Sequence, residues 1–387
     1  MNNHIKLRNQ NGFSLVELMV GAVIGLFLTT GAIGILVTSK QTYNVQDDLA
    51  RIQENARFAM GIIVRDLRMA GYFGCHDNLT NISNNLNGGA VAGHLFDATF
   101  GIEGMEGTEL ALIWRPSQNI VDPLLATLGG PTVGDMWLDA VNGRPDALTL
   151  RFLSGTQMPV DGIAMNSGAA DIPLAANVIG LQPGDLAGIA DCGSADIFRV
   201  TNAATPVNAL QHDSGLAEWD NSDGALSRAY TTVTDGASVT TSVVGLFNSV
   251  RYYIGRGAGE DGIANNADDI PSLFRRVYDR TLPGYSNTEL VEGVEDFQIT
   301  YGVDTTGDGL PNGYIEGDDN LGAVDLTTAA GWQSVVGVRI GIMFVSPVET
   351  SNDIDNNNYN VNNSVFDPVD DRRRRRVFTS TVQIRNL

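Results

Sequence analysis

The first part of the chain carries its apolar residues in two successive patterns. From Leu18 to Val37, twenty consecutive residues carry no charge and are rich in Leu, Ile, Val, Gly and Ala. A helix rises about 1.5 Å per residue, so this run is long enough to span a hydrocarbon core of roughly 30 Å. Beyond it, apolar residues recur at spacings of three and four, which predicts an amphipathic helix with one stripe to bury: Leu49, Ile52, Ala56, Ala59, Ile63 and Leu67.

We predict that both patterns belong to one continuous helix from Phe13 to Ala70. No proline occurs before Pro116, and such a helix would be about 87 Å long. Gly71 is expected to form its C-terminal cap. The charged residues of the second half are expected mostly on faces away from the stripe: Asp47, Asp48, Arg51, Glu54, Arg57 and Arg65.

After Gly71 the pattern changes to short runs in which apolar and polar residues alternate. This period of two predicts strands of an antiparallel sheet with one apolar face, for which the helical stripe is the expected partner. The fold class is therefore α+β, with long surface loops expected at 255–272, 302–333 and 346–371. The clearest alternating runs are 148–152, 250–254, 297–301, 336–344 and 378–384.

Composition narrows the possible functions. The chain has 387 residues and a formal net charge of −21, which argues against binding to nucleic acid, whose phosphates need a basic surface. Two cysteines and four histidines are poor material for a metal enzyme. The chain contains the His-Asp dipeptide His212-Asp213, but no G-x-S-x-G or P-loop motif accompanies it. A membrane-tethered enzyme is the alternative of a different class; it would need retained leader residues and a folded active pocket.

The extreme N-terminus predicts the orientation of the apolar run. Residues 1–12 include Lys6 and Arg8 but no acidic residue. Positive flanks stay cytoplasmic, so the bulk of the chain is expected outside the cytoplasm. A secretory signal has a shorter apolar region followed by a small-residue cleavage site, whereas this run continues into a helical pattern. We therefore expect the segment to remain attached as an anchor.

The junction N-G-F-S-L-V-E-L-M-V, residues 11–20, resembles the class III signal of type IV pilins and type II secretion pseudopilins. The resemblance implies that prepilin peptidase cuts after Gly12, that the new N-terminal Phe13 is methylated, and that Glu17 supports assembly by meeting the N-terminal amine of a neighbouring subunit. A carboxylate in a spanning segment costs roughly 2.5–3.5 kcal/mol, so it needs a reason. The alternative is a carboxylate that merely reaches the membrane interface.

Gly21 and Gly25 form a small-xxx-small pair that would let helices approach closely, although glycine is common in membrane helices anyway. The implied division of the chain is a leader at 1–12, a transmembrane or filament-core helix at 13–37, its amphipathic continuation at 38–71, and an extracytoplasmic β-rich domain at 72–387.

Several downstream stretches look like the PilW group of minor pilins: 71–75, 191–201, 291–304 and 375–386. That resemblance implies a type IV pilin fold and a non-enzymatic role in initiating pilus assembly, within a tip complex. The implied partners are prepilin peptidase, other minor pilins, the major pilin, the assembly platform, membrane lipid and a large tip adhesin. The implied location is the inner membrane, with the globular domain in the periplasm, and then the pilus tip. A type II secretion pseudopilin of the J type is the alternative, although those are generally shorter.

Cys75 and Cys192 are expected to form a disulfide, because both would lie outside the cytoplasm. A bridge closing so long a loop could contribute on the order of 4–5 kcal/mol. The alternative is a metal site using Cys75-His76 with Cys192, but neither His94 nor His212 has the spacing of a ligand.

Two further features have open interpretations. Residues 304–315 resemble a calcium loop through Asp304 and Asp308, but Thr306 and Ile315 depart from the EF-hand pattern. Oxygen-rich loops also occur at 261–269 and 353–357, and all three could simply be turns. The five arginines 372–376 are expected to be a solvated strand entrance paired with Asp367, Asp370 and Asp371, or else a docking patch for an acidic neighbouring subunit.

Overall fold

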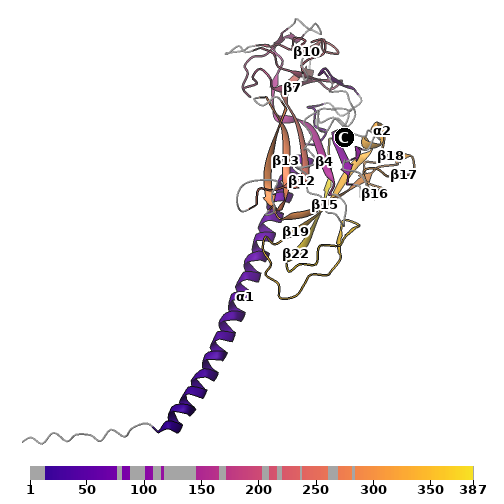
Figure 1. Cartoon of the computed structure of the whole chain (residues 1–387). Coiled ribbons are helices and arrows are strands. Elements are labelled where there is room, and N and C mark those ends of the chain that lie inside the picture. Colours follow the sequence, from indigo (N-terminus) through magenta and orange to yellow (C-terminus); the bar gives the residue numbers. More distant parts are fainter. Residues whose placement is uncertain are drawn as a thin grey trace, which may run out of the picture.

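A single long helix, α1 (Leu15–Leu67), projects from a β-rich head (Figure 1). The computed structural model describes residues 14–75, 81–87, 101–107, 115–116, 145–164, 171–202, 209–215, 220–235, 238–259, 269–280 and 284–386. The 53 residues of α1 correspond to about 80 Å of helix. The expected end at Ala70 is wrong by one turn. Met69 and Ala70 donate to the carbonyls three residues before them, and Gly71, at φ 74°, turns the chain so that its N–H reaches the carbonyl of Arg151.

The larger sheet of the head is built around the long strand β12 (Val243–Arg256). One side of β12 pairs with β4 (Ala147–Pro159), and the other side pairs first with β7 and then with β13. All pairs are antiparallel except β1 with β8. The remaining strands are β1 (Ile82–Asn84), β2 (Ile102–Glu106), β3 (Arg115–Pro116), β7 (Leu186–Ala190), β8 (Ala195–Arg199), β13 (Pro271–Asp279) and β14 (Gly284–Glu292).

A second, four-stranded antiparallel sheet lies beside the helix end of the head (Figure 1). Its strand order is β16 (Gly313–Ile315), β15 (Val294–Val303), β19 (Val335–Val345) and β22 (Arg375–Gln383). The lobe farthest from α1 contains β5 (Ile163–Ala164), β6 (Ile172–Pro173), β9 (Ala209–Leu210), β10 (Tyr230–Asp235) and β11 (Ser238–Thr241).

The main core lies where the second half of α1 meets both sheets, as the stripe predicts. Ile52, Ala56, Ala59, Ile63 and Leu67 are buried against apolar residues of β4, β12, β15 and β19. Leu49, the first residue of the expected stripe, is half-buried. The distal lobe has a separate core that includes Met158, Ile172 and Phe198. The helix therefore stabilises the head through its C-terminal half.

Two of the expected loops contain short regular elements. Within 302–333 lie β16, β17 (Asn320–Leu321), β18 (Val324–Asp325) and α2 (Ala329–Trp332), and within 346–371 lie β20 (Tyr359–Val361) and β21 (Ser364–Phe366). Trp332 is fully buried edge-on against Tyr301, with ring centroids 4.7 Å apart. The first insertion is thus fastened to the core. Of 255–272, residues 260–268 lie outside the described residues.

Candidate functional site: the N-terminal helix and its anchorage

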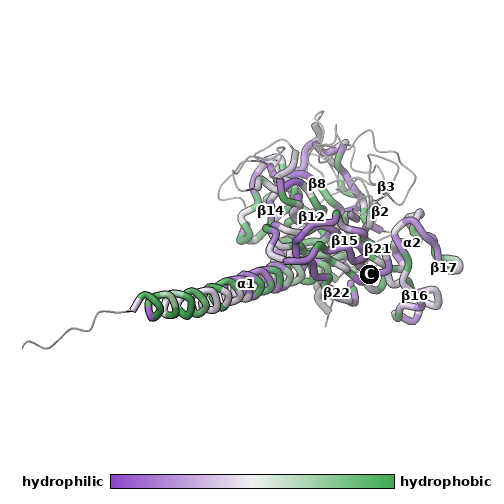
Figure 2. The backbone as a smooth tube through the Cα atoms, turned by 60° about the horizontal axis from the view of Figure 1, so that its bottom comes forward, coloured by the Kyte–Doolittle hydropathy of each residue, from purple (hydrophilic) through white to green (hydrophobic). Residues whose placement is uncertain are grey.

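The N-terminal half of α1 is apolar and exposed along its whole length. No residue of its most apolar stretch is buried, and the helix is long and apolar enough to cross a membrane. Figure 2 shows hydrophobic positions along this half and more hydrophilic ones toward the head. Leu26 and Phe27, for example, are 71% and 81% exposed. A surface of this kind is unfavourable in water, so it requires lipid or other helices around it.

The threonine hydroxyls within this half form hydrogen bonds to the backbone of the helix itself. Four threonine hydroxyls donate to the carbonyl four residues earlier, at 2.7–3.0 Å: Thr29, Thr30, Thr38 and Thr42. A hydroxyl bonded in this way carries no unmet donor into lipid. The threonines therefore do not oppose burial of the segment.

Glu17 caps the start of the helix. The Ser14 N–H donates to its carboxylate at 3.0 Å, and the Glu17 N–H donates to the Ser14 hydroxyl at 3.3 Å, which together form a capping box. The helix dipole also favours a negative charge here. Gly12 and Phe13, expected to flank the processing site, lie outside the described residues. The hydrogen bond from Ser14 places the Glu17 carboxylate beside the residue that follows Phe13 in the chain.

The glycines of the exposed half leave open space on the helix surface. A Cβ atom built on Gly21 or Gly25 would meet no heavy atom within 4 Å. Their absent side chains therefore serve no contact within the described part of the chain. A close helix–helix contact remains a prediction for this pair.

Asp66 anchors the C-terminal end of α1 in the head. Its buried carboxylate accepts hydrogen bonds from the Tyr252 hydroxyl at 2.6 Å and from Arg275 at 3.3 Å, and Arg65 lies at 3.2 Å. The apolar periodicity does not identify Asp66 as a buried residue. The partners come from β12 and β13, more than 180 residues away, so only the tertiary structure reveals this anchor.

A second set of polar contacts ties α1 to the C-terminal part of the chain. Asp48, expected on an outer face, is instead buried and accepts a hydrogen bond from Thr350. The Asn386 side chain donates to the carbonyls of Arg68 and Ala70 at 2.9 and 3.5 Å. The prediction for Asp48 was wrong because helical periodicity assigns polar residues to the exposed face. A polar partner on an insertion, here Thr350, allows such a residue to be buried instead.

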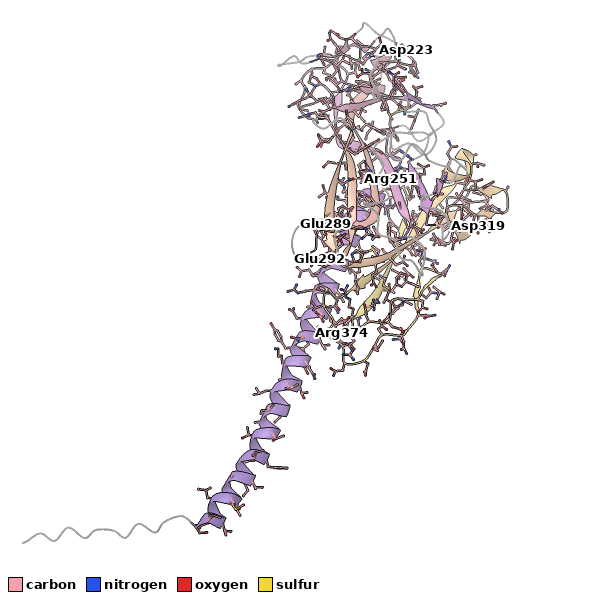
Figure 3. All side chains as sticks on the ribbon, in the orientation of Figure 1. Asp223, Arg251, Glu289, Glu292, Asp319 and Arg374 are labelled. Carbon is pink, nitrogen blue, oxygen red and sulfur yellow. A yellow bond between two sulfur atoms is a disulfide. The ribbon has the colours of Figure 1, made fainter. Side chains whose placement is uncertain are left out.

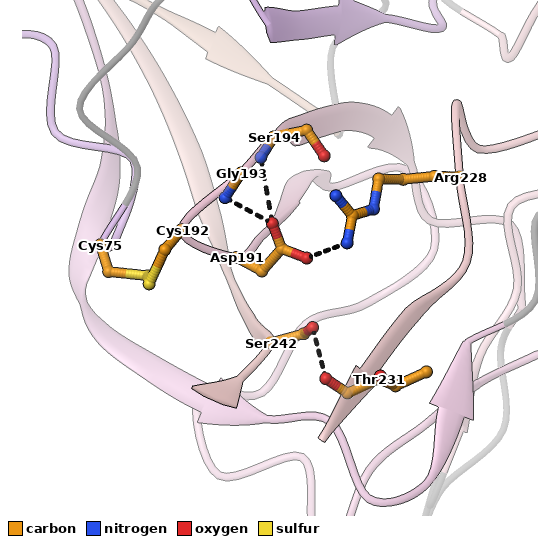
Figure 4. The surroundings of a disulfide bond; sticks show 8 residues. All are labelled: Cys75, Asp191, Cys192, Gly193, Ser194, Arg228, Thr231 and Ser242. Carbon is orange, nitrogen blue, oxygen red and sulfur yellow. Dashed lines mark hydrogen bonds and ion pairs between the residues drawn. A yellow bond between two sulfur atoms is a disulfide. The ribbon is translucent and has the colours of Figure 1, made fainter. Parts of the chain in front are cut away.

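The structure joins Cys75 and Cys192 in the expected disulfide, with Cα atoms 4.8 Å apart (Figure 4). Asp191, the residue before Cys192, accepts hydrogen bonds from the N–H groups of Gly193 and Ser194 at 2.8 and 3.0 Å. Arg228 donates to its other oxygen at 2.7 Å. The bridge therefore joins the chain just after α1 to the rigid turn between β7 and β8.

The carboxylates of the expected calcium loop are occupied by hydrogen bonds within the loop. Asp304 accepts from the N–H groups of Thr306, Gly307 and Gly309 at 2.6–2.9 Å, and Asp308 accepts from Leu310 at 2.9 Å. These hydrogen bonds, that of Gly309 above all, lower the pKa of Asp304 to about 2. Within the described residues no group of three or more His, Cys, Asp or Glu could hold a metal. Calcium binding stays a prediction.

The arginine cluster contains one buried member, two half-buried members and two exposed members. Arg375 is buried and bonds Glu295 at 2.6 Å, Asp371 at 2.7 Å and Asp355 at 3.2 Å. Burial opposes the charged guanidinium, but hydrogen bonds to Asp371 and Glu295 outweigh it and raise the pKa of Arg375. The expected pairing with Asp371 is present. The expectation of a solvated side chain is wrong for Arg375, because three carboxylates take the place of water around its guanidinium group.

One buried carboxyl pair was not foreseen. Glu106, at the end of β2, accepts from the Gly317 N–H at 2.5 Å, and Asp146 accepts from Gly107 and Ile299 at 3.0 and 2.8 Å. Burial raises the pKa of Glu106 to about 7, and burial together with the Glu106 charge raises that of Asp146. The pair joins the larger sheet to β15 and to the insertion at 304–333.

Comparisons with known families agree with this architecture. The family described as type IV pilus-assembly protein W matches residues 251–386, and the prokaryotic N-terminal methylation motif matches residues 7–33. The C-terminal third of the chain is therefore similar to the PilW family. The PilW match covers β13–β15, β19 and β22, which form the larger part of the α1 docking surface. No curated protein and no solved structure matches the chain. PilW proteins act in type IV pilus assembly, and an N-terminal helix able to anchor the protein in a membrane fits that role.

Proposed function

We propose that this protein is a minor pilin of the PilW family that helps to initiate type IV pilus assembly, in a complex at the filament tip. The supporting observation is a methylation motif on the exposed, apolar half of α1, which is joined to a head whose C-terminal part matches PilW. The head is held in the periplasm by α1 until assembly, and the role is structural rather than enzymatic. Its partners are other minor pilins, the major pilin, the assembly platform and a large tip adhesin.

Assembly replaces lipid around the exposed half of α1 by neighbouring helices. Cleavage after Gly12 makes Phe13 a positively charged N-terminus, beside the carboxylate of Glu17. An ammonium left unpaired in a low-dielectric helix bundle costs several kcal/mol, so each such group needs a carboxylate. Glu17 supplies it, either within its own chain or for the next subunit.

The processing step is tested first. Gly12→Leu should leave the precursor uncut, because the motif requires a residue without a side chain at the scissile bond. Mass spectrometry of the N-terminus of membrane-extracted protein measures this, with Asn11→Ala as the matched control that should be cut normally. A mature wild-type protein that begins anywhere except at Phe13 contradicts the assignment.

The assembly role is tested at Glu17. Glu17→Ala and Glu17→Gln should be inserted and cleaved normally, since loss of the charge makes insertion easier. Both should fail to co-purify with other minor pilins and should reduce surface pili, because neither supplies the negative charge. Glu54→Gln removes an exposed carboxylate from the head-proximal half of the same helix and should behave as wild type.

If strains carrying either Glu17 variant form pili at the wild-type level, Glu17 is a charge that the membrane interface tolerates and has no role in assembly. Normal piliation of a strain lacking the whole gene, combined with a loss of protein secretion, would favour the pseudopilin alternative.

A further inference from the structure

β22 is an edge strand with one hydrogen-bonded neighbour. Within the described residues it pairs with β19 alone, in the four-stranded order β16-β15-β19-β22. The Ile384 N–H donates to the carbonyl of Val336, and the Ser346 N–H donates to that of Arg374. In an antiparallel ladder alternate residues face the same neighbour, so the even-numbered residues of β22 bond to β19. The N–H and C=O groups of Val377, Thr379, Thr381 and Gln383 therefore point away from it.

This outward edge is accessible. Thr379, Thr381 and Gln383 are exposed, and Val377 is half-buried. In the part of the chain that the structure describes, the backbone groups of these four residues bond to no other segment. Val377 to Val382 carry no charge, no glycine and no proline. An uncharged, β-prone edge of this length is a template for another strand.

Positive charge borders both ends of the edge. Arg372, Arg374 and Arg376 precede or begin the strand and Arg385 follows it; none has an ion pair within the described residues, whereas Arg375 has three. Figure 3 shows Arg374 on the underside of the head, beside α1. These arginines stand out on a chain with a net charge of −21. Since charges more than about 8 Å apart are screened at physiological ionic strength, a ligand on this edge responds to the local arginines.

We propose that the β22 edge binds an extended segment of another polypeptide, which adds a strand to the sheet and carries acidic residues at its ends. Its backbone pairs with Val377, Thr379, Thr381 and Gln383, and its carboxylates meet the flanking guanidinium groups. A second copy of this chain is a poor occupant. Antiparallel pairing of two β22 strands would place Arg376 of one copy near Arg385 of the other, and like charges repel.

This proposal stands apart from the role of Glu17, because β22 lies in the head. The test uses the full chain in detergent micelles and labelled nine-residue peptides whose uncharged centre alternates Thr and Val. One peptide has acidic ends and one has lysine ends; a third has acidic ends and N-methylated alternate amides, which cannot pair. Fluorescence anisotropy should show binding of the first peptide alone, weakened by salt.

Thr381 provides a matched pair of variants. Thr381→Pro removes one outward N–H but no bond to β19, since proline is tolerated on an edge whose N–H faces solvent. It should weaken peptide binding by about tenfold, the upper end for one hydrogen bond. Thr381→Val retains the N–H and should bind as wild type. Replacing Arg374 and Arg376 by Gln should weaken binding and flatten its salt dependence.

Three results would overturn the proposal. The first is equal binding of the acidic and lysine-ended peptides. The second is unchanged binding by Thr381→Pro when unfolding curves show an intact head, since this would leave only side-chain attraction. The third is the absence of peptide binding together with self-association of the arginine variants. That result would mean that the arginines prevent edge-to-edge aggregation instead of binding a partner.

Discussion

Glu106 and Asp146 place two carboxyl groups in a region where water cannot solvate their charges. The pKa of Glu106, ordinarily 4.5, rises to about 7 through burial. The folded protein therefore binds this proton more tightly than the unfolded chain does. The resulting stabilisation is fully present below pH 4.5 and is lost as the pH rises through about 7.

The first prediction follows from this sign. Glu106→Gln removes the titration, so the difference in unfolding free energy between variant and wild type should change with pH. From pH 8 to pH 5 the wild type should gain on the order of 1–3 kcal/mol relative to Glu106→Gln. Urea unfolding at the two pH values measures it, with Glu289→Gln, on the exposed part of β14, as the control. A pH-independent difference would contradict the raised pKa of Glu106.

The disulfide gives a second prediction at the residue scale. Cys75→Ser should lower the unfolding free energy by roughly 4–5 kcal/mol, because the bridge closes a loop with a sequence separation of 117. Cys192→Ser and the double variant should show the same loss, since all three lack one bridge. Denaturant unfolding measures the loss, and thiol labelling of unreduced, denatured wild-type protein should detect no thiol. An additional loss in the double variant would mean that the cysteines act separately.

At the scale of elements, α1 consists of two halves with different requirements. The first half buries nothing in the head, and the second half supplies the stripe from Ile52 to Leu67. Asp66 is the polar exception on that stripe, with Tyr252 and Arg275 as partners. Removing its carboxylate leaves the Tyr252 hydroxyl and the Arg275 guanidinium without this acceptor. The loss of stability should therefore exceed that of a single hydrogen bond.

We therefore predict that Asp66→Ala lowers the unfolding free energy by about 2–4 kcal/mol. Asp47→Ala is the matched control on the same helix. Asp47 pairs with Arg51 at the surface, 48% exposed, and its loss should cost less than about 0.5 kcal/mol. Chemical denaturation of both variants measures the difference. Equal effects would show that the buried contact contributes no more than a surface ion pair.

The regular elements that follow a period were largely predictable from the sequence. The stripe of α1 and the strands β4, β12, β15, β19 and β22 all lie where the apolar periods place them. The structure of the insertions was not predictable. Trp332, for example, becomes a core residue through its contact with Tyr301, and the helix that carries it has four residues, too few to show a period. Asp48 and Arg375 were misjudged, and Asp66 was not identified, for a related reason. Polarity predicts exposure unless a distant partner neutralises the charge, and a single sequence contains no signal for that partner.

At the scale of the whole molecule, the head and the exposed half of α1 are structurally independent. Buried contacts of α1 begin at Asp48, and the Gln41 side chain bonds Asn352 at a stretched 3.4 Å. A fragment that starts at Thr42 should therefore fold, remain soluble without detergent, and unfold within about 3 °C of the full chain in micelles. A fragment that starts at Arg57 removes Asp48 and Ile52 and should unfold at a clearly lower temperature. Calorimetry compares them; equal values for both fragments would contradict the role assigned to the second half of α1.

The disulfide also determines how the molecule would carry a mechanical load. A pull on α1 passes through the turn after Leu67 to Cys75, crosses directly to Cys192, and continues through β8 toward the C-terminal sheet. Because the disulfide bypasses residues 76–191, that stretch of chain carries none of the tension. Near the C-terminus, the hydrogen bond from Asn386 to the end of α1 connects the last strand back to the helix. Sequence inserted between the two cysteines can therefore grow or change without lengthening the path along which tension travels.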